Sequence, residues 1–168
     1  MTLGEFYRRA YANTPDIAGH LPGFVAEVLT RDAQQVIEVG VGNGNSSAAW
    51  LFGLAGTGGH LWSVDIEPTA AAFELQGICP DWTYVIGDSL ACADLAPQGA
   101  DILFIDSLHT YDQTLAELEV YVPHVKPGGV VLLHDTVTHP PVAAALVAFC
   151  GDGWTNITHT SGLGRIDL

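Results

Sequence analysis

The sequence predicts an α/β fold in which a doubly wound, mostly parallel sheet has helices on both of its faces. Short, nearly continuous apolar runs alternate with segments of helical length along the 168 residues. This pattern is typical of strands that crossover helices bury on both faces. A glycine-rich turn, "EVGVGNGNSS", follows the first apolar run. Ligands of such sheets bind beyond the carboxyl ends of the strands, so the turn marks a candidate site.

Length and composition fit one globular domain over residues 1–168, since 48% of the residues are apolar and 14% are charged. Five Lys and Arg stand against nineteen Asp and Glu, a net charge of −14. Nucleic acids and anionic membranes attract basic surfaces, so we expect neither as a partner. The start of the chain lacks a signal-peptide core, and no apolar run is long enough to cross a bilayer. Three cysteines without CxxC spacing indicate reduced thiols and a cytoplasmic location.

The expected elements follow in chain order. Residues 1–35 form a short N-terminal helical segment, with helices over 4–11 and 21–30. The predicted strands span residues 36–40, 61–65, 83–87, 102–106 and 130–134. The helices between and after them span residues 45–55, 69–76, 90–95, 111–122 and 141–150. Two further strands, over 154–158 and 162–166, are expected at the far edge of the sheet.

Local signals support several of the helices. The glycine-rich turn is followed by three residues of the type that caps a helix: Asn45, Ser46 and Ser47. The segment "HPPV" places prolines in the first turn of the last helix, where a missing N–H is harmless. Apolar residues at i, i+4, i+7 and i+11 predict the face of the 111–122 helix that packs on the sheet: Tyr111, Leu115, Leu118 and Val122.

Acidic residues occur at the ends of the first three strands. Glu38 argues for a cationic group nearby, because a carboxylate would repel a pyrophosphate. Asp65 lies 21 residues after Gly44, about the spacing at which an acid reaches ribose hydroxyls. Asp88 and Ser89 stand where an adenine edge could be hydrogen-bonded. No Lys or Arg accompanies these acids, so together they indicate a nucleotide without phosphates. A ligand-free turn and solvated loop carboxylates are the alternatives.

Four segments, "VIEVGVGNGNSS", "VDIEP", "VIGDSL" and "KPGGVVLLHD", resemble in order and spacing the class I S-adenosylmethionine-dependent methyltransferases. The stretch "FIDSLHTYDQTLAELEVYVPHVKPGGVVLLHDT" is similar to small-molecule O-methyltransferases of the macrocin and catechol types. The resemblance implies a Rossmann-like, seven-stranded sheet with an antiparallel C-terminal strand, and S-adenosylmethionine as cofactor. It implies these cofactor-binding residues: Glu38, Gly40, Gly42, Gly44, Asn45, Ser46, Asp65, Ile66, Gly87, Asp88, Ser89 and Asp106.

The ends of the fourth and fifth strands predict where a methyl acceptor is activated. In the strand order 3-2-1-4-5 they are neighbours, so Asp106, His109, His134 and Asp135 can converge. Asp106, His134 and Asp135 are the expected metal ligands. The two carboxylates suit Mg²⁺, whereas His134, where relatives have an acid, would favour a softer ion. His109 is the expected general base, with Asp106 as its catalytic partner. The alternatives are a turn-capping Asp106, a His134 that fills the sheet end and a His109 that starts a helix.

The sequence indicates little about the function of the other histidines. His139 could line the mouth of the acceptor site, and no role is assigned to the rest: His20, His60, His124 and His159.

Two other enzyme classes fit the sequence less well. Amino-group methyltransferases have a [DNS]PP[YFW] turn after the fourth strand, and that place holds "DSLH" here, which argues against this class. A nicotinamide oxidoreductase would need a third glycine where Asn45 stands.

The predicted function is therefore S-adenosylmethionine-dependent methyl transfer to a hydroxyl of a small molecule such as a sugar, phenol or polyketide, with help from a divalent metal. About 35 residues precede the first strand, so a homo-oligomer or a partner subunit would complete the acceptor pocket, or the acceptor is small. A cofactor-binding but inactive subunit is the alternative of a different class.

Overall fold

The computed structural model describes residues 1–13, 16–157 and 160–168. The helices are α1 (Leu3–Asn13), α2 (Leu21–Arg31), α3 (Asn45–Thr57), α4 (Ala70–Gln76), α5 (Tyr111–Tyr121) and α6 (Pro140–Cys150). The strands are β1 (Gln35–Val39), β2 (His60–Asp65), β3 (Trp82–Ile86), β4 (Ala100–Ile105), β5 (Val125–His134), β6 (Thr155–Ile157) and β7 (Leu163–Asp167). Two short 3₁₀ turns are η1 (Ala93–Leu95) and η2 (Val122–His124).

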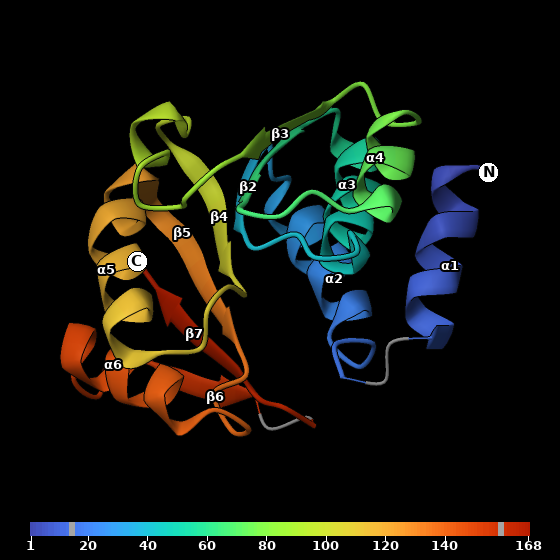
Figure 1. The fold of residues 1–168 in the computed structure, drawn as a ribbon. Coiled ribbons are helices and arrows are strands. Elements are labelled where there is room, and N and C mark those ends of the chain that lie inside the picture. The colour runs from blue at the N-terminus through green and yellow to red at the C-terminus, as the bar shows by residue number, and fades with distance from the viewer. Residues whose placement is uncertain (14–15, 158–159) are drawn as a thin grey trace.

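The strands form one seven-stranded sheet in the order β3-β2-β1-β4-β5-β7-β6. Strands β1 to β5 are parallel, β7 pairs antiparallel with β5, and β6 pairs antiparallel with β7. Helices α1 to α4 lie on one side of the sheet and α5 and α6 on the other (Figure 1). The predicted Rossmann-like α/β fold is confirmed. Among the described residues no helix is long and apolar enough to span a membrane.

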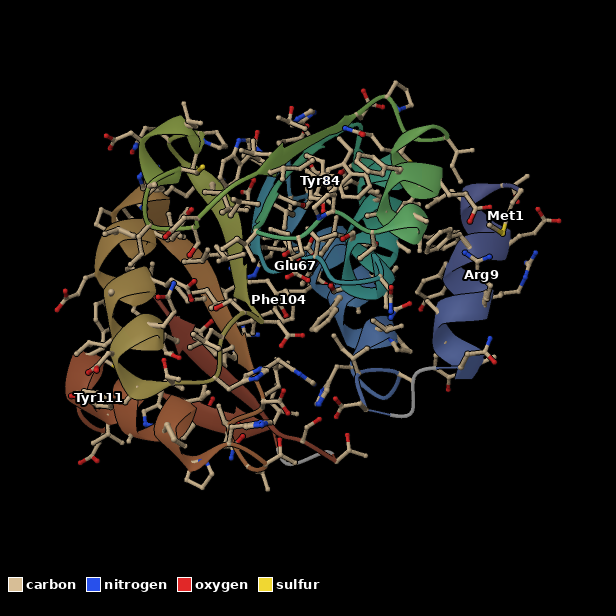
Figure 2. All side chains as sticks on the ribbon, viewed as in Figure 1. Met1, Arg9, Glu67, Tyr84, Phe104 and Tyr111 are labelled. Carbon is tan, nitrogen blue, oxygen red and sulfur yellow. The ribbon has the colours of Figure 1, made fainter. Side chains whose placement is uncertain are left out.

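Alternating residues of the strands fill two separate cores, as the two-residue repeat of a strand requires. Val36 and Ile102 belong to the core under α1 to α4, whereas Ile37 and Leu103 belong to the core under α5 and α6. In the first core Phe104, labelled in Figure 2, packs against Phe24 of α2 and Trp50 of α3, with ring centroids 4.9 and 5.6 Å away. These parallel strands are buried on both faces, which explains their continuous apolar runs.

Several boundaries differ from the predicted ones. The expected helix over 90–95 is only the 3₁₀ turn η1, because Asp88 Oδ1 accepts the amides of Leu90 and Ala91 and holds the chain in a local turn. Strand β5 begins at Val125, before the glycines. Asn45, Ser46 and Ser47 do not cap α3, whose N-cap is Gly44 without a side-chain hydrogen bond. The predicted strand 154–158 is β6, and its last residue lies outside the described ranges.

Helix α5 is rotated relative to the predicted face, of which Leu118 is fully buried as predicted. Its buried residues are Thr114, Glu117, Leu118 and Tyr121, whereas Tyr111 is 39% exposed. Polar partners for Glu117 on the sheet side explain the rotation, since Ser89 and Ser107 donate hydrogen bonds to its carboxylate. The predicted face was counted from apolar residues alone, so it could not include these polar contacts.

The ends of β1 and β4 approach each other very closely at Gly40. This residue has φ +92°, and a Cβ built on it would lie 1.9 Å from the Asp106 carbonyl oxygen. The Gly40 amide donates to Val64 of β2, and the Asp106 amide donates to Val39. Glycine is therefore required at position 40 by both conformation and space.

Strand β1 also holds a carboxylate inside the fold. Glu38 is fully buried, and its Oε2 accepts the hydroxyls of Ser47 and Ser63, each at 2.7 Å. Its Oε1 has no hydrogen-bond partner among the described residues. Burial raises the pKa of Glu38 to about 7, against the hydrogen bonds of the serines, which lower it. The carboxylate is thus a destabilising group at alkaline pH.

We predict that Gly40→Ala reduces the free energy of unfolding by more than about 4 kcal/mol, the range of severe substitutions, because the added methyl group meets backbone. Gly42→Ala is the matched control, since its Cβ meets no atom within 4 Å and only its φ of +51° is unfavourable. Gly42→Ala should reduce the free energy of unfolding by about 1–2 kcal/mol. Urea unfolding of both variants measures the difference. Equal losses would show that the close approach is not a constraint.

We predict that Glu38→Gln stabilises the protein increasingly as pH rises. The folded-state pKa of about 7 exceeds the ordinary 4.5. Below pH 4.5 the wild-type carboxyl is therefore protonated in both the folded and the unfolded protein, and the free energy of unfolding falls between pH 4.5 and 7. Glutamine does not titrate. The variant should gain on the order of 3 kcal/mol over wild type between pH 4.5 and 8. Denaturant unfolding at both pH values tests this, and parallel pH profiles would contradict it.

Candidate functional site

Two adjoining cavities open at the carboxyl ends of the parallel strands. The first, of about 480 Å³, lies beyond the ends of β1 to β4, and we call it the nucleoside-side cavity. The second, of about 240 Å³, lies over the β1–α3 turn and the ends of β4 and β5, and we call it the cluster cavity. Both are lined by Gly40, Gly42 and Asp106. One elongated ligand could therefore occupy both.

The nucleoside-side cavity contains most residues that the strand ends predicted. Its lining includes Asp65, Ile66, Gly87, Asp88 and Ser89. Asp65 Oδ2 accepts the amides of Val41 and Gly42 at 2.7 and 2.8 Å, and its Oδ1 accepts the amide of Glu67. The Asp65 side chain thereby holds the glycine-rich turn against the end of β2. A carboxylate has about four lone-pair sites, so these bonds leave acceptor capacity.

A polar network in the wall of the nucleoside-side cavity was not predicted. Glu117 of α5 is fully buried and accepts hydrogen bonds from Ser89 and Ser107, each at 2.6 Å, and from Gln113 at 3.0 Å. Tyr121 donates to the Ser89 carbonyl oxygen. The network fixes the loops after β3 and β4. A polar residue on the buried face of α5 was the only signal in the sequence.

The cluster cavity brings together the four residues predicted after β4 and β5. His109 Nε2 lies 3.2 Å from Asp106 Oδ1 and 3.0 Å from Asp135 Oδ2. His134 Nδ1 lies 3.2 Å from Asp135 Oδ2 and 3.5 Å from Asp106 Oδ2. Asp135 has φ +64°, the left-handed region that Asp tolerates better than most residues. Two imidazoles therefore face two carboxylates.

Charge coupling within this cluster is strong. The Asp106 hydrogen bond and the nearby carboxylates raise the pKa of His109. Burial alone would raise the pKa of Asp106, but the two imidazoles lower it to about 2. Burial likewise opposes charge on His134, and the Asp106 and Asp135 carboxylates still raise its pKa. The cluster thus stabilises positive charge beside Asp106.

Three further side chains join the cluster, and of these the sequence pointed only to His139, which contacts the cluster but lines neither cavity. The ring of His139 stacks on His109 with centroids 4.3 Å apart, and His139 Nδ1 lies 3.5 Å from Asp135 Oδ1. Thr138 donates a short hydrogen bond to the same Asp135 oxygen. Asp16, from the loop before α2, lines the cluster cavity. No local pattern marks Asp16, since only the tertiary fold places it there.

Within the described residues, two groups have ligand atoms within 4.8 Å of one another, as metal binding requires: His109, Asp135 and His139, and Asp16, His134 and Asp135. Asp106 belongs to neither group, although its Oδ2 faces His134.

The remaining predicted residues lie around the two cavities. Asn45 and Ser46, at the start of α3, line the cluster cavity, whereas Glu38 and Gly44 line neither. His20, for which we predicted no role, packs edge to face on His134 at 5.5 Å. The other unassigned histidines lie apart: His60 bonds Thr83 and His124 contacts Gln98. His159 is outside the described ranges.

Several solved structures share this fold. The SAH-bound methyltransferase PaMTH1 from Podospora anserina superposes with a TM-score of 0.79, at 15% identity, covering 98% of this chain and 86% of the other. The O-methyltransferase TomG from Streptomyces achromogenes, in complex with SAM, gives 0.75 at 18% identity, covering 97% and 87%. MycE, solved with Mg, SAH and mycinamycin VI, gives 0.70 at 16% identity, covering 99% of this chain and 54% of MycE.

Sequence comparison agrees at the level of the family. No curated protein shows a significant sequence match to the chain. A family model described as "Methyltransferase domain" matches residues 37–136, which include the glycine-rich turn, the ends of β2 to β5 and Asp135. The chain belongs to this methyltransferase domain family.

Proposed function

We propose that the chain is an S-adenosylmethionine-dependent methyltransferase that transfers the methyl group to a hydroxyl of a small molecule, assisted by a divalent metal. The observation that supports this most is the junction of the two cavities at Gly40, Gly42 and Asp106. It places an acid-lined nucleoside site directly beside an imidazole–carboxylate cluster. A methyl group at the junction would face a base.

The charge of the lining favours a cationic nucleoside. Lys and Arg are absent from the described lining of both cavities, whereas Asp65, Asp88 and Asp106 are present. A sulfonium and an ammonium group suit such a site better than phosphates. Ile66 and Leu108 are 69% and 63% exposed on the nucleoside-side cavity and offer apolar contacts for an adenine ring.

The polar handles of the cofactor have matching residues. Asp65 would accept the ribose hydroxyls, and Asp88 and Ser89 would bind the adenine amine from the loop after Gly87. The start of α3 presents free amides that suit a carboxylate. There Asn45 and Ser46 would meet the methionine end. Glu38 and Gly44 would act from behind, by setting the charge and the shape of the turn. PaMTH1 and TomG bind SAH and SAM on the same fold.

His109 is the group best placed to accept the hydroxyl proton. With its Nε2–H directed at the carboxylates of Asp106 and Asp135, the lone pair lies on Nδ1. The acceptor proton would pass to this nitrogen while the oxygen attacks the methyl carbon. The electrons of the breaking C–S bond remain on sulfur, which leaves S-adenosylhomocysteine. The two carboxylates stabilise the imidazolium that forms.

A divalent ion fits the cluster by an observation of this structure. His134 is 2% exposed and its Nδ1 has no hydrogen-bond partner among the described residues, although two carboxylates face it. Asp106, His134 and Asp135 would hold the ion. When bound, it would lower the pKa of an acceptor hydroxyl and orient it. MycE, on the same fold, was solved with Mg.

The domain extent, the location and the partners of the protein are part of the same proposal. We propose residues 1–168 as one methyltransferase domain that acts in the cytoplasm, without nucleic acid or membrane as partner, in keeping with a net charge of −14 and three free cysteines. The cluster cavity, about 240 Å³, is smaller than the roughly 300–1,000 Å³ of most small-molecule sites. A second copy or a partner subunit would therefore complete the acceptor pocket.

We predict that the protein binds S-adenosylmethionine and S-adenosylhomocysteine but not NAD. Asp65→Ala should weaken both affinities by about 1–3 kcal/mol, because charge-assisted hydrogen bonds to the ribose are lost. Asp94→Ala is the matched control, since Asp94 is an exposed acid in η1 outside both cavities. Titration calorimetry measures all affinities. Binding of NAD alone would overturn the cofactor assignment.

We predict that His109→Gln lowers the rate of methyl transfer by about 10²–10⁴, the usual contribution of a general base. His60→Gln is the control, because His60 starts β2 at the opposite end of the strands. S-adenosylhomocysteine release, measured over sugar, phenolic and polyketide hydroxyls, gives the rate. A full rate in His109→Gln would exclude the base role. Silence across the screen despite tight cofactor binding would favour an inactive subunit.

A further inference from the structure

The hydrogen bonds of Ser161 determine the tautomer of His134. Ser161 Oγ lies 3.2 Å from the Asp16 carbonyl oxygen and 3.1 Å from His134 Nε2. A carbonyl oxygen can only accept, so the single hydroxyl proton goes to Asp16. Ser161 Oγ must then accept from His134 Nε2–H. The lone pair of the neutral His134 ring is consequently on Nδ1.

This lone pair points at negative charge. His134 Nδ1 is buried and lies 3.2 Å from Asp135 Oδ2 and 3.5 Å from Asp106 Oδ2, without a hydrogen-bond partner in the described ranges. A lone pair and two carboxylates repel one another at these distances, and either a proton on Nδ1, which the raised pKa of His134 favours, or a bound cation relieves the repulsion. The side chain of Asp16 adds a third carboxylate, in ligand range of His134 and Asp135.

We propose that His134 Nδ1, Asp135 and Asp16 bind a divalent transition-metal ion such as Zn²⁺ or Co²⁺ in preference to Mg²⁺. Imidazole nitrogen binds these ions well, whereas Mg²⁺ prefers oxygen ligands alone. Asp16 and Asp135 complete a mixed nitrogen and oxygen set. Asp16 takes the place that the proposed function gives to Asp106, because Asp106 belongs to neither described group whose ligand atoms lie within 4.8 Å of one another. Ion binding itself follows from the cluster, and only its role at a methyl acceptor rests on the proposed function.

Ser161 positions two ligands of this set at once. It holds the His134 ring through Nε2 and the loop of Asp16 through the backbone, and its own carbonyl accepts the Val137 amide. Metal-binding histidines commonly have such a partner on the second ring nitrogen, which fixes the tautomer and the ring. The edge of the His20 ring covers His134 from the α2 side. The ligand nitrogen is therefore oriented before an ion arrives.

The test uses the full chain after removal of metals by a chelator and dialysis. Zn²⁺ and Mg²⁺ are titrated into ¹⁵N-labelled protein and the imidazole nitrogens are followed by NMR, with affinities from calorimetry. We expect Zn²⁺ to shift His134 Nδ1 strongly and to bind at least about 100-fold more tightly than Mg²⁺, in line with the ligand preferences of the two ions. Co²⁺ binding, read from visible absorption, should match Zn²⁺.

Three variants separate the ligands from the fold. Asp16→Asn changes an exposed loop residue and should weaken Zn²⁺ binding at least about tenfold. His134→Gln should weaken it further, and His134→Asp should reverse the preference toward Mg²⁺. His124→Gln is the control, because His124 is also buried but lies in η2. It should bind Zn²⁺ like wild type.

The outcomes are distinct for the two proposals. Unchanged His134 resonances with Zn²⁺, or equal Zn²⁺ affinity in wild type and Asp16→Asn, would overturn the ligand set, as would tighter binding of Mg²⁺ than of Zn²⁺. S-adenosylhomocysteine is titrated into the same samples. If it binds while no metal does, the metal inference fails and the cofactor assignment stands. If Zn²⁺ binds as expected and the nucleoside does not, the proposed function fails and the metal site stands.

Discussion

The contact between Gly40 and the Asp106 carbonyl is the constraint on which the rest of the site depends. A side chain at position 40 would collide with backbone at 1.9 Å, so β1 and β4 can end this close together only with glycine there. The contact brings the glycine-rich turn beside Asp106 and joins the two cavities. Asp65 holds the same turn from the other side, through the amides of Val41 and Gly42. Without this contact the two cavities would not share Gly40, Gly42 and Asp106 as lining residues.

The parts of the fold that local pattern determines could be predicted from the sequence. The five parallel strands and the residues at their carboxyl ends follow from apolar runs and turn chemistry, and their order is that of doubly wound sheets in general. The face of α5 could not, because its burial is decided by Ser89 and Ser107, which reach Glu117 from other loops. Asp16 was likewise not predictable, since it reaches the cluster through hydrogen bonds from Thr160 and Ser161 and the packing of the loop before α2. Features that depend on tertiary contacts between polar groups could not be predicted.

Buried acidic side chains destabilise the folded protein as well as making its interior reactive. Glu38 raises the free energy of the folded state at alkaline pH, and the carboxylates of the cluster are compensated only by imidazoles or by a bound cation. Lys126 and Arg165 neutralise other acids, Asp101 and Glu27, away from the cavities. Positive charge near the strand ends is therefore left for the histidines of the cluster or for ligands to supply. A protein that binds a sulfonium and a metal ion should be measurably more stable with either bound.

The Ser161 contacts also join parts of the chain that are far apart in the sequence. The bonds of Asp65 to the glycine-rich turn join residues 24 and 23 positions apart, whereas the bond of Ser161 to Asp16 joins residues 145 positions apart. Contacts between distant parts of a chain form slowly, because closing a long loop costs more entropy. The nucleoside side of the pocket can thus be complete while the loop of Asp16 and the β7 edge are still separate. In a newly made chain, the loop of Asp16 would therefore be the late part of the cluster cavity to close.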